Sequence, residues 1–416
     1  IEKRMCCLRP LGRPTMSWHT RCGLAAISAL ACATTLAVGQ TTVRAKVLSS
    51  RPEMVSGGSA LIEIDGAATH PSLSVWIGSR EITGAFRPGQ IQDALVGLVG
   101  GLASGENHLE VRDGKKVLAS LALVNHDASD SLVSGTKQSP FICETVAAGL
   151  GEPLDKDCSA STRVFYIYKS TQPPPAPGAT AAGLPAGFKL YVPGSTPMPA
   201  DVAQIPGPAG TPVPYFVRVE RGTLNRAVYQ IAFLHQPGTP LPTPWKRAGT
   251  LNGRLVYSFG GGCGGGYHQG GIEGGLDEAV LLRGYAEATA SLNVLQTNCN
   301  DVISAETAER VKEYFIKTFG APVHTIGIGA SGGSIQQYLI AQNYPGILDG
   351  IIPIASFPDV ASILPGIVDC SLMARVFDSF STPLSEEQKT AIAGFAAWKT
   401  CTNVPVSWMA LQFSPN

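Results

Sequence analysis

The sequence predicts an α/β protein with a mostly parallel sheet and helices on both faces, preceded by a small β-sandwich-like domain. Short apolar runs separated by turn residues fill residues 43–124, whereas strand and helix patterns alternate over residues 254–359. Repeated strand–helix units favour parallel strands and cover both faces of the sheet. A chain of 416 residues also has room for two or three domains, at about 150 residues each.

Composition excludes several classes of protein. Hydrophobic residues make up 44% of the chain and charged residues 15%, which predicts a folded chain rather than a disordered one. Basic and acidic residues number 31 each and form no long basic run, so no nucleic-acid partner is expected. The 47 glycines and 31 prolines favour a loop-rich exported protein over a helical bundle.

The first 39 residues resemble an export signal. An uncharged apolar run over residues 22–39 follows Arg13 and Arg21, and Ala37-Val38-Gly39 supplies small residues for cleavage. We therefore expect a secreted or periplasmic protein with no stable membrane span after cleavage; an anchoring helix and a lipoprotein site at Cys32 are the alternatives. Because the sequence begins with Ile1, translation is expected to start at Met16, with Met5 as the alternative.

Six cysteines follow the predicted signal. An even number in an exported chain favours disulfides, and six cysteines allow 15 connectivities. Pairing between sequence neighbours is one of them, and buried free thiols are the alternative. No spacing typical of a zinc site occurs, so neither a metal nor another cofactor is expected. The six are Cys143, Cys158, Cys263, Cys299, Cys370 and Cys401.

Residues 40–127 are predicted to form the β-sandwich-like domain. Strand patterns cover residues 60–64, 73–77, 108–112 and 115–124, and Asp113-Gly114 predicts a hairpin turn. Residues 128–214 are expected to form a cysteine-containing segment and a Pro-rich connection, with twelve prolines within 173–214. The run over 188–192 is expected to pack against a neighbouring domain.

Residues 215–416 are predicted to form the α/β domain. The expected strands cover 254–259, 323–329 and 349–355. The expected helices cover 276–292, 305–319 with Ser304 as N-cap, 332–343, and a segment near 385–399.

A serine occupies the predicted turn between a strand and a helix. Gly329-Ala330-Ser331-Gly332-Gly333 fits the pattern G-x-S-x-G. In such a turn, small neighbours let strand and helix approach, and the serine hydroxyl projects above the sheet. Ser331 is therefore a candidate nucleophile, and the N–H of Gly332 a candidate oxyanion donor.

The glycine run over residues 260–266 ends the first strand of the α/β domain. Backbone N–H groups of such a run are unobstructed, so Gly261 and Gly262 are candidates for the second oxyanion donor. A merely flexible loop is the alternative.

The same turn also fits a dinucleotide fingerprint, G-x-G-x-x-G, over Gly327–Gly332. That fingerprint requires an acidic residue about 20 positions on, at the end of the next strand. Asp349 precedes that strand and Asp359 lies 27 residues after Gly332, so a nucleotide-dependent enzyme is the weaker hypothesis.

The run over 329–338, with 341–345 and 349–352, resembles the tannase and feruloyl esterase group of α/β-hydrolases. The segments 140–145, 282–286, 292–301 and 356–359 resemble more closely an exported bacterial α/β-hydrolase-like family of unknown function. This resemblance implies an α/β-hydrolase fold and ester hydrolysis with Ser331 as nucleophile. Tannase-type sequences carry a disulfide-bonded cysteine before the nucleophile, and this sequence has Ala330 there.

No histidine follows Ser331, although this fold orders its triad as serine, acid, histidine. We therefore expect the domain to be incomplete at its C-terminal end, with the base beyond Asn416 and this fragment inactive. Within the sequence, His268 is the candidate base and Asp359 the candidate acid. His324 and Asp369 are weaker candidates, and Ser334 is expected to pack or to face the substrate.

The sequence therefore predicts a secreted serine esterase for a small-molecule or polymeric ester. A non-catalytic hydrolase-like binding module is the main alternative.

Overall fold

The computed structural model describes residues 42–173, 184–194, 198–207, 210–247, 250–357, 360–394 and 396–402. One compact unit extends over Thr41–Asn416. The predicted signal peptide, residues 1–39, lies outside the described residues, so its prediction stands untested. The boundaries proposed at 127/128 and 214/215 likewise remain predictions.

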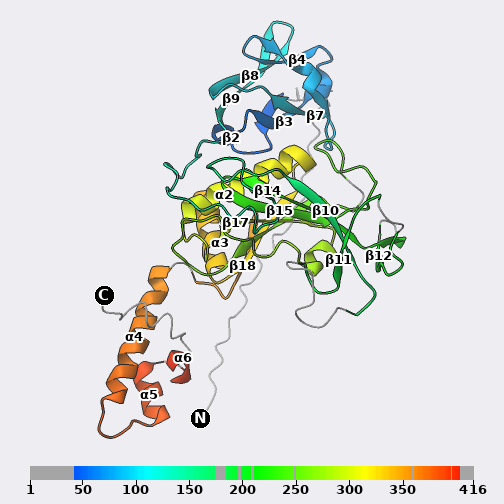
Figure 1. Cartoon of the computed structure of the whole chain (residues 1–416). Coiled ribbons are helices and arrows are strands. Elements are labelled where there is room, and N and C mark those ends of the chain that lie inside the picture. Colours follow the sequence, from blue (N-terminus) through cyan, green and yellow to red (C-terminus); the bar gives the residue numbers. More distant parts are fainter. Residues whose placement is uncertain are drawn as a thin grey trace, which may run out of the picture. The chain divides into compact units, whose positions relative to one another are not determined.

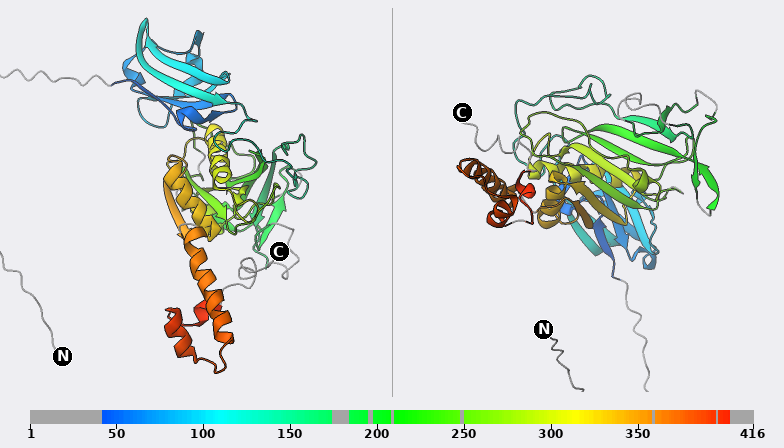
Figure 2. Two further views of the ribbon diagram at one scale, coloured as in Figure 1. Left: turned by 90° about the vertical axis from the view of Figure 1, so that its left-hand side faces the viewer. Right: turned by 90° about the horizontal axis from the view of Figure 1, so that it is seen from below.

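The N-terminal strands form two sheets that pack face to face (Figure 2). Ile62, Val75, Val99 and Leu109 are among the buried residues of the core between them. One sheet has the order β1 (Arg44–Val47), β3 (Ser59–Asp65), β7 (Ala94–Gly100), β6 (Phe86–Pro88). The other has the order β2 (Val55–Ser56), β9 (Lys116–His126), β8 (Gly105–Asp113), β4 (Leu73–Ile77), β5 (Arg80–Glu81).

The predicted hairpin is confirmed, with its turn one residue further along than expected. Asp113 pairs with Lys116, which leaves Gly114 and Lys115 as the two-residue turn. Gly114 has a φ of 58°, a left-handed conformation that glycine adopts without steric cost.

The central sheet has eight strands. Its order is β11 (Phe188–Tyr191), β10 (Arg163–Lys169), β14 (Phe216–Leu224), β15 (Ala227–Leu234), β17 (Ala286–Val294), β16 (Arg254–Gly260), β18 (His324–Ala330), β19 (Gly350–Ile354). Only the pairs β17–β16, β16–β18 and β18–β19 are parallel; the other four neighbouring pairs are antiparallel. The prediction of a mostly parallel sheet is therefore wrong. The sheet is mixed, because four strands join it without crossover helices, namely β10, β11, β14 and β15.

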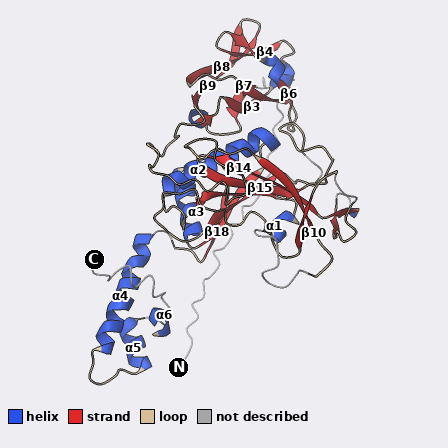
Figure 3. Cartoon of the chain, viewed as in Figure 1, coloured by secondary structure: helices blue, strands red, loops and turns tan. Residues whose placement is uncertain are grey.

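Alternation along β15 assigns the two faces of this sheet. Tyr229, Ile231 and Phe233 belong to the buried cluster that includes α2 (Asp301–Phe319), whereas Ala232 and Leu234 belong to a different cluster, which includes α1 (Glu278–Leu281). Successive strand residues point to opposite faces, so α2 and α1 cover opposite faces. α3 (Gly332–Asn343) contacts α2 and lies beside it (Figures 1 and 3).

The prediction of a helix over 276–292 is wrong. Only Glu278–Leu281 is helical, Gly284 has a φ of 74°, and Ala286–Val294 forms strand β17. The apolar residues of β17 alternate with Glu287, Thr289, Ser291 and Asn293, which are buried as well. Alanine is a strong helix former and every side chain here is buried, so tertiary packing overrides the local preference.

Helix α2 begins earlier than expected. Asn300, not Ser304, is the N-cap, and its side chain accepts a hydrogen bond from the N–H of Ile303. Ser304 is a buried helical residue whose hydroxyl donates to Gln336 Oε1 at 2.6 Å. C-terminal Gly320 ends the helix, as predicted.

Two glutamates of α2 bind the N-terminal part of the chain. Glu313 accepts hydrogen bonds from the N–H and hydroxyl of Ser56. Glu306 accepts from Ser131 Oγ and from the backbone N–H groups of Val133 and Ser134, at 2.9–3.0 Å. Backbone donors replace water around these buried carboxylates, which makes their burial tolerable.

The C-terminal helices pack on one another. α4 (Val360–Asp378) contacts both α5 (Glu386–Ala393) and α6 (Lys399–Thr402) (Figure 3). Between them lies a small core of Cys370, Phe377, Trp398 and Cys401. α4 was missed in the sequence. Ser385 caps α5 with a capping box, at the start of the segment predicted to be helical.

The described parts of the Pro-rich connection are ordered. Strand β11 lies within it, and Phe188 is buried, as the run over 188–192 predicted. Two further short strands, β12 (Gln204–Pro206) and β13 (Pro212–Pro214), pair antiparallel. Among the described helices, none has the length and apolar character needed to cross a bilayer.

Candidate active site

Ser331 occupies a strained turn between β18 and α3. It is the N-cap of α3, and its φ of 56° and ψ of −118° are unfavourable for a residue with a Cβ. Its N–H donates to the carbonyl of Ile354 at 3.0 Å, which anchors the turn to the end of β19. Strain of this kind persists only where the surroundings fix it, and it is typical of functional turns.

Close packing explains the glycines on either side of Ser331. A Cβ at Gly329 or at Gly333 would collide with the carbonyl oxygen of Phe259 on β16. The strand and the helix therefore approach a third backbone segment so closely that positions two before and two after Ser331 must lack side chains. The G-x-S-x-G spacing thus has a steric basis in this fold.

The glycine loop lies against the turn. A Cβ on Gly261 would be 3.8 Å from Ser331 Cβ, and one on Gly332 would collide with the carbonyl of Gly262. The structure thus brings together Ser331 and the three predicted donors, Gly261, Gly262 and Gly332. Among the described residues, nothing accepts a hydrogen bond from the N–H of Gly262 or of Gly332.

The glycine loop is fastened to the segment after β17. Gln296 N–H donates to the Gly261 carbonyl at 2.8 Å, Gly264 N–H to the Leu295 carbonyl at 2.8 Å, and a disulfide joins Cys263 to Cys299. A side chain at Gly264 would collide with the Gln296 carbonyl. These contacts make the loop a fixed structure rather than the flexible connection that was the alternative.

Two buried glutamines, missed in the sequence, support the turn from α3. Gln336 donates to the Gly260 carbonyl at 2.9 Å. Gln337 donates to the carbonyls of Gly329 and Gly333, and it accepts from the N–H of Ile352. The sequence does not predict this role, because the role depends on hydrogen bonds to residues of three neighbouring strands.

His268 forms a pair with Glu144. Nδ1 of His268 lies 2.8 Å from Oε2 of Glu144, which also accepts from the N–H of Gly270. These hydrogen bonds, that of His268 first, lower the pKa of Glu144 despite its partial burial. No hydrogen bond joins His268 to Ser331 within the described residues. Glu144 was not singled out in the sequence, since 124 residues separate it from its partner.

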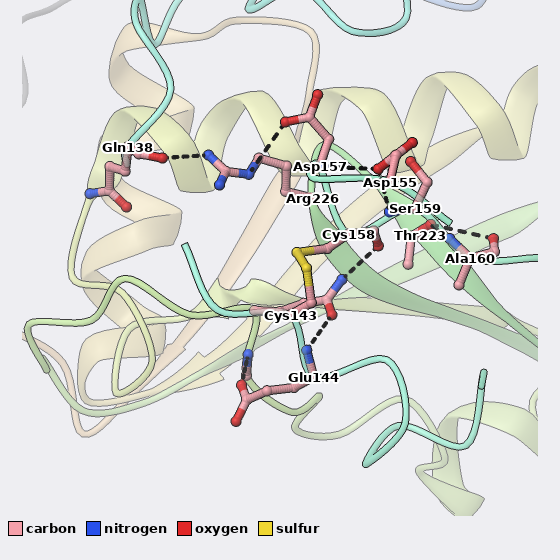
Figure 4. The surroundings of a disulfide bond; sticks show 12 residues. Gln138, Cys143, Glu144, Asp155, Asp157, Cys158, Ser159, Ala160, Thr223 and Arg226 are labelled. Carbon is pink, nitrogen blue, oxygen red and sulfur yellow. Dashed lines mark hydrogen bonds and ion pairs between the residues drawn. A yellow bond between two sulfur atoms is a disulfide. The ribbon is translucent and has the colours of Figure 1, made fainter. Parts of the chain in front are cut away.

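A disulfide positions Glu144. Cys143, its neighbour, is bonded to Cys158, and Figure 4 shows the three residues together. Arg226 lies in the surroundings of this disulfide and donates to the Gln138 carbonyl at 2.9 Å (Figure 4). With Cys263–Cys299 and Cys370–Cys401, the three bonds realise the neighbour pairing. Three disulfides fit an oxidising, extracellular environment.

The other candidates lie apart from Ser331 or outside the description. Asp359 is outside the described residues. His324 begins β18, at the far end of the strand from Ser331, and Asp369 is an exposed residue of α4. Ser334 is buried and donates to the Ser331 carbonyl at 2.6 Å, so it packs.

The geometry disfavours the dinucleotide hypothesis. Asp349 accepts from the N–H of Thr325 at 2.7 Å, at the amino end of β18, whereas the glycine turn lies at the carboxyl end. The carbonyl of Gly262 also occupies the space beside Gly332, where a pyrophosphate would approach the helix.

The fold and the site define an α/β protein with a serine on a tight strand–helix turn facing a glycine loop. The chain belongs to the tannase-like family of unknown function (DUF6351), whose model matches residues 45–413. The relationship to tannases predicted from the sequence is confirmed by this membership. No curated protein matches the sequence.

Several solved esterases are similar to this chain. Feruloyl esterase B from Aspergillus oryzae is 16% identical, with 60% of this chain and 44% of that chain covered and a TM-score of 0.29. Another esterase from Aspergillus oryzae is 15% identical with the same coverage and TM-score. Tannin acyl hydrolase from Aspergillus niger is 13% identical, with 64% and 48% covered and a TM-score of 0.30. The chain spans less than half the length of each.

Proposed function

We propose that this protein is a secreted serine hydrolase that cleaves carboxylic esters through an acyl-enzyme at Ser331, on a variant of the α/β-hydrolase fold. The observation that carries the proposal is the strained Ser331 turn, at φ 56°, beside two backbone N–H groups without described acceptors. The proposed substrate class is a small-molecule or polymeric ester.

The residues around Ser331 suit acyl transfer. The hydroxyl oxygen of Ser331 attacks the ester carbonyl carbon while a base takes its proton, and the carbonyl oxygen becomes an oxyanion. The N–H groups of Gly332 and Gly262, with the positive end of the α3 dipole, stabilise that charge. Collapse breaks the ester C–O bond, and the leaving alkoxide takes the proton from the base. Water then gives a proton to the base and attacks the acyl carbon, which releases the acid as Ser331 regains its proton.

His268 is the base that this sequence offers. Its Nδ1–H donates to the Glu144 carboxylate at 2.8 Å, which leaves Nε2 as the acceptor for a proton. In this arrangement Glu144 takes the orienting role first assigned to Asp359. The contact with Ser331 would form in the substrate complex, since such hydrogen bonds tighten on binding.

A histidine outside this sequence is the other source of the base, and the chain alone would then be inactive. The missing contact between His268 and Ser331 also favours the second candidate function, a hydrolase-like module that binds without catalysis. The two functions differ in the reactivity of Ser331.

Labelling with a fluorophosphonate tests the proposal. Intact-mass analysis is expected to find one adduct on Ser331 in this chain, none in Ser331→Ala, and an undiminished adduct in the matched variant Ser334→Ala. An adduct that persists in Ser331→Ala would contradict the nucleophile assignment. His268→Asn then identifies the base: loss of p-nitrophenyl acetate hydrolysis supports His268, whereas full activity excludes it.

A further inference from the structure

A cavity of about 600 Å³ lies in the α/β part of the chain, and Ser331 does not line it. Its walls come from the loop closed by the Cys143–Cys158 disulfide, from strands β14 and β15, and from the glycine-rich segment 270–276. Small-molecule sites occupy roughly 300–1,000 Å³, so the volume suits a small ligand. Among its lining residues, the proposed acyl transfer uses Glu144, which orients His268.

Three charged side chains line the cavity. Glu144 accepts hydrogen bonds from His268 and Gly270 at one carboxylate oxygen, Oε2, and no described residue donates to the other. Glu273 makes no described side-chain hydrogen bond. Arg221 donates from Nη1 to the Ala148 carbonyl and from Nη2 to Gln230, and its buried Nε has no partner among the described residues.

The glycine-rich wall adds backbone donors. No described residue accepts a hydrogen bond from the N–H groups of Gly271, Ile272, Glu273 or Gly274. The segment is held at its end instead, where Gly275 and Asp277 donate to the buried carboxylate of Glu287 at 3.0 and 2.7 Å. The glycine-rich wall of the cavity therefore carries backbone N–H groups that no described residue uses.

The balance of charge and donors selects the ligand. Two carboxylates against one guanidinium disfavour an anion. Carboxylate acceptors beside N–H donors match hydroxyl groups, which donate and accept at once. Ala147, Val228 and Leu276 add apolar surface for C–H groups.

We propose that this cavity is a binding site for a neutral, hydroxyl-rich ligand of the saccharide class, separate from Ser331. Hydroxyls of the sugar donate to the carboxylates of Glu144 and Glu273 and accept from the amides of 271–274. The site does not depend on the proposed ester hydrolysis.

Saccharide binding to the whole chain tests the proposal. Saturation-transfer NMR and calorimetry with glucose, maltose and cellobiose are expected to detect binding, equally in Ser331→Ala. Glu273→Gln keeps the side-chain volume and removes the charge, so affinity is expected to fall about tenfold, the effect of losing one hydrogen bond to a charged group. Glu152→Gln, at an exposed position in the same disulfide loop that does not line the cavity, is the matched control and is expected to bind normally.

Three results would overturn the proposal. One is that none of the three sugars binds at tens of millimolar. Another is that Glu273→Gln binds them as tightly as the Glu152→Gln control, with both variants showing unchanged thermal unfolding. The third is that sulfate, benzoate or Ca²⁺ binds in the cavity while the sugars do not. Because Ser331→Ala is included, failure here is distinguishable from failure of the esterase proposal.

Discussion

Glu144 and His268 are 124 residues apart in sequence, yet Oε2 of the one lies 2.8 Å from Nδ1 of the other. Both residues belong to segments that disulfides fasten: Cys143 precedes Glu144, and Cys263 lies five residues before His268. His268 lies two residues after the glycine loop, and Glu144 lines the cavity. Each disulfide fixes one of the two loops. Backbone hydrogen bonds from Ile142 to Tyr267 and from Gln269 to Ile142 then join the loops to each other.

Gly332→Ala is expected to abolish the donor geometry at Ser331. The added methyl group would collide with the Gly262 carbonyl, so the loop must move. Loss of one oxyanion donor costs about 10²–10³ in rate, and overpacking costs about 1–3 kcal/mol of unfolding free energy. Fluorophosphonate labelling rates and urea titrations measure both effects. Gly265→Ala is the control, because a Cβ there meets nothing within 4 Å and both quantities should be unchanged.

Removing the Cys263–Cys299 disulfide is expected to loosen the glycine loop. For a loop closed over 36 residues, the chain-entropy argument gives a loss of about 3–4 kcal/mol of unfolding free energy. Cys263→Ser/Cys299→Ser is also expected to slow labelling of Ser331. The double variant Cys370→Ser/Cys401→Ser opens a loop of similar length among the C-terminal helices and should label at the original rate. Equal slowing in both variants would argue against a local effect.

Ser334→Ala separates packing from catalysis. The Ser334 hydroxyl is buried and donates to the Ser331 carbonyl at 2.6 Å. Its loss is expected to lower the free energy of unfolding by about 1 kcal/mol. Labelling of Ser331 should be retained, since the hydroxyl contacts the backbone rather than the reacting oxygen. Abolished labelling in a folded Ser334→Ala variant would instead give Ser334 a functional role.

Glu309 makes stability depend on pH. Burial is the main cause that raises its pKa from 4.5 to about 7; the neighbouring Glu313 raises it further, while Lys312 and Arg51 oppose the shift. Between these two values the unfolded chain has lost the proton and the folded protein keeps it. The contribution of Glu309 to stability is therefore largest below pH 4.5, falls as pH rises to about 7, and then levels off, with a total loss on the order of 3 kcal/mol.

Glu309→Gln removes this titration. The free energy of urea unfolding is measured for wild type and for Glu309→Gln from pH 4 to pH 8. The wild-type value minus the variant value is expected to fall over this range as the contribution of Glu309 is lost. Other carboxylates titrate in both proteins, so the difference isolates Glu309. A difference independent of pH would exclude the shifted pKa.

The sequence alone determined the features that depend on local stereochemistry. Gly329 and Gly333 around Ser331 predicted a tight strand–helix turn, and α3 over Gly332–Asn343 has the predicted bounds. The hairpin at Asp113-Gly114 was predicted from a turn preference in the same way, with a shift of one residue. Each of these signals lies within a few residues, where backbone sterics are decisive.

Only the tertiary structure decided the features that depend on distant partners. Residues 286–294 form a strand because β15 and β16 pair with them on both sides, although their alanines favour a helix. The sheet is mixed because four strands from earlier in the chain join it. Glu144, Gln336 and Gln337 acquire their roles from contacts with other elements. A long-range contact leaves no periodic trace in a single sequence, because its free energy is gained only when both partners are already in place.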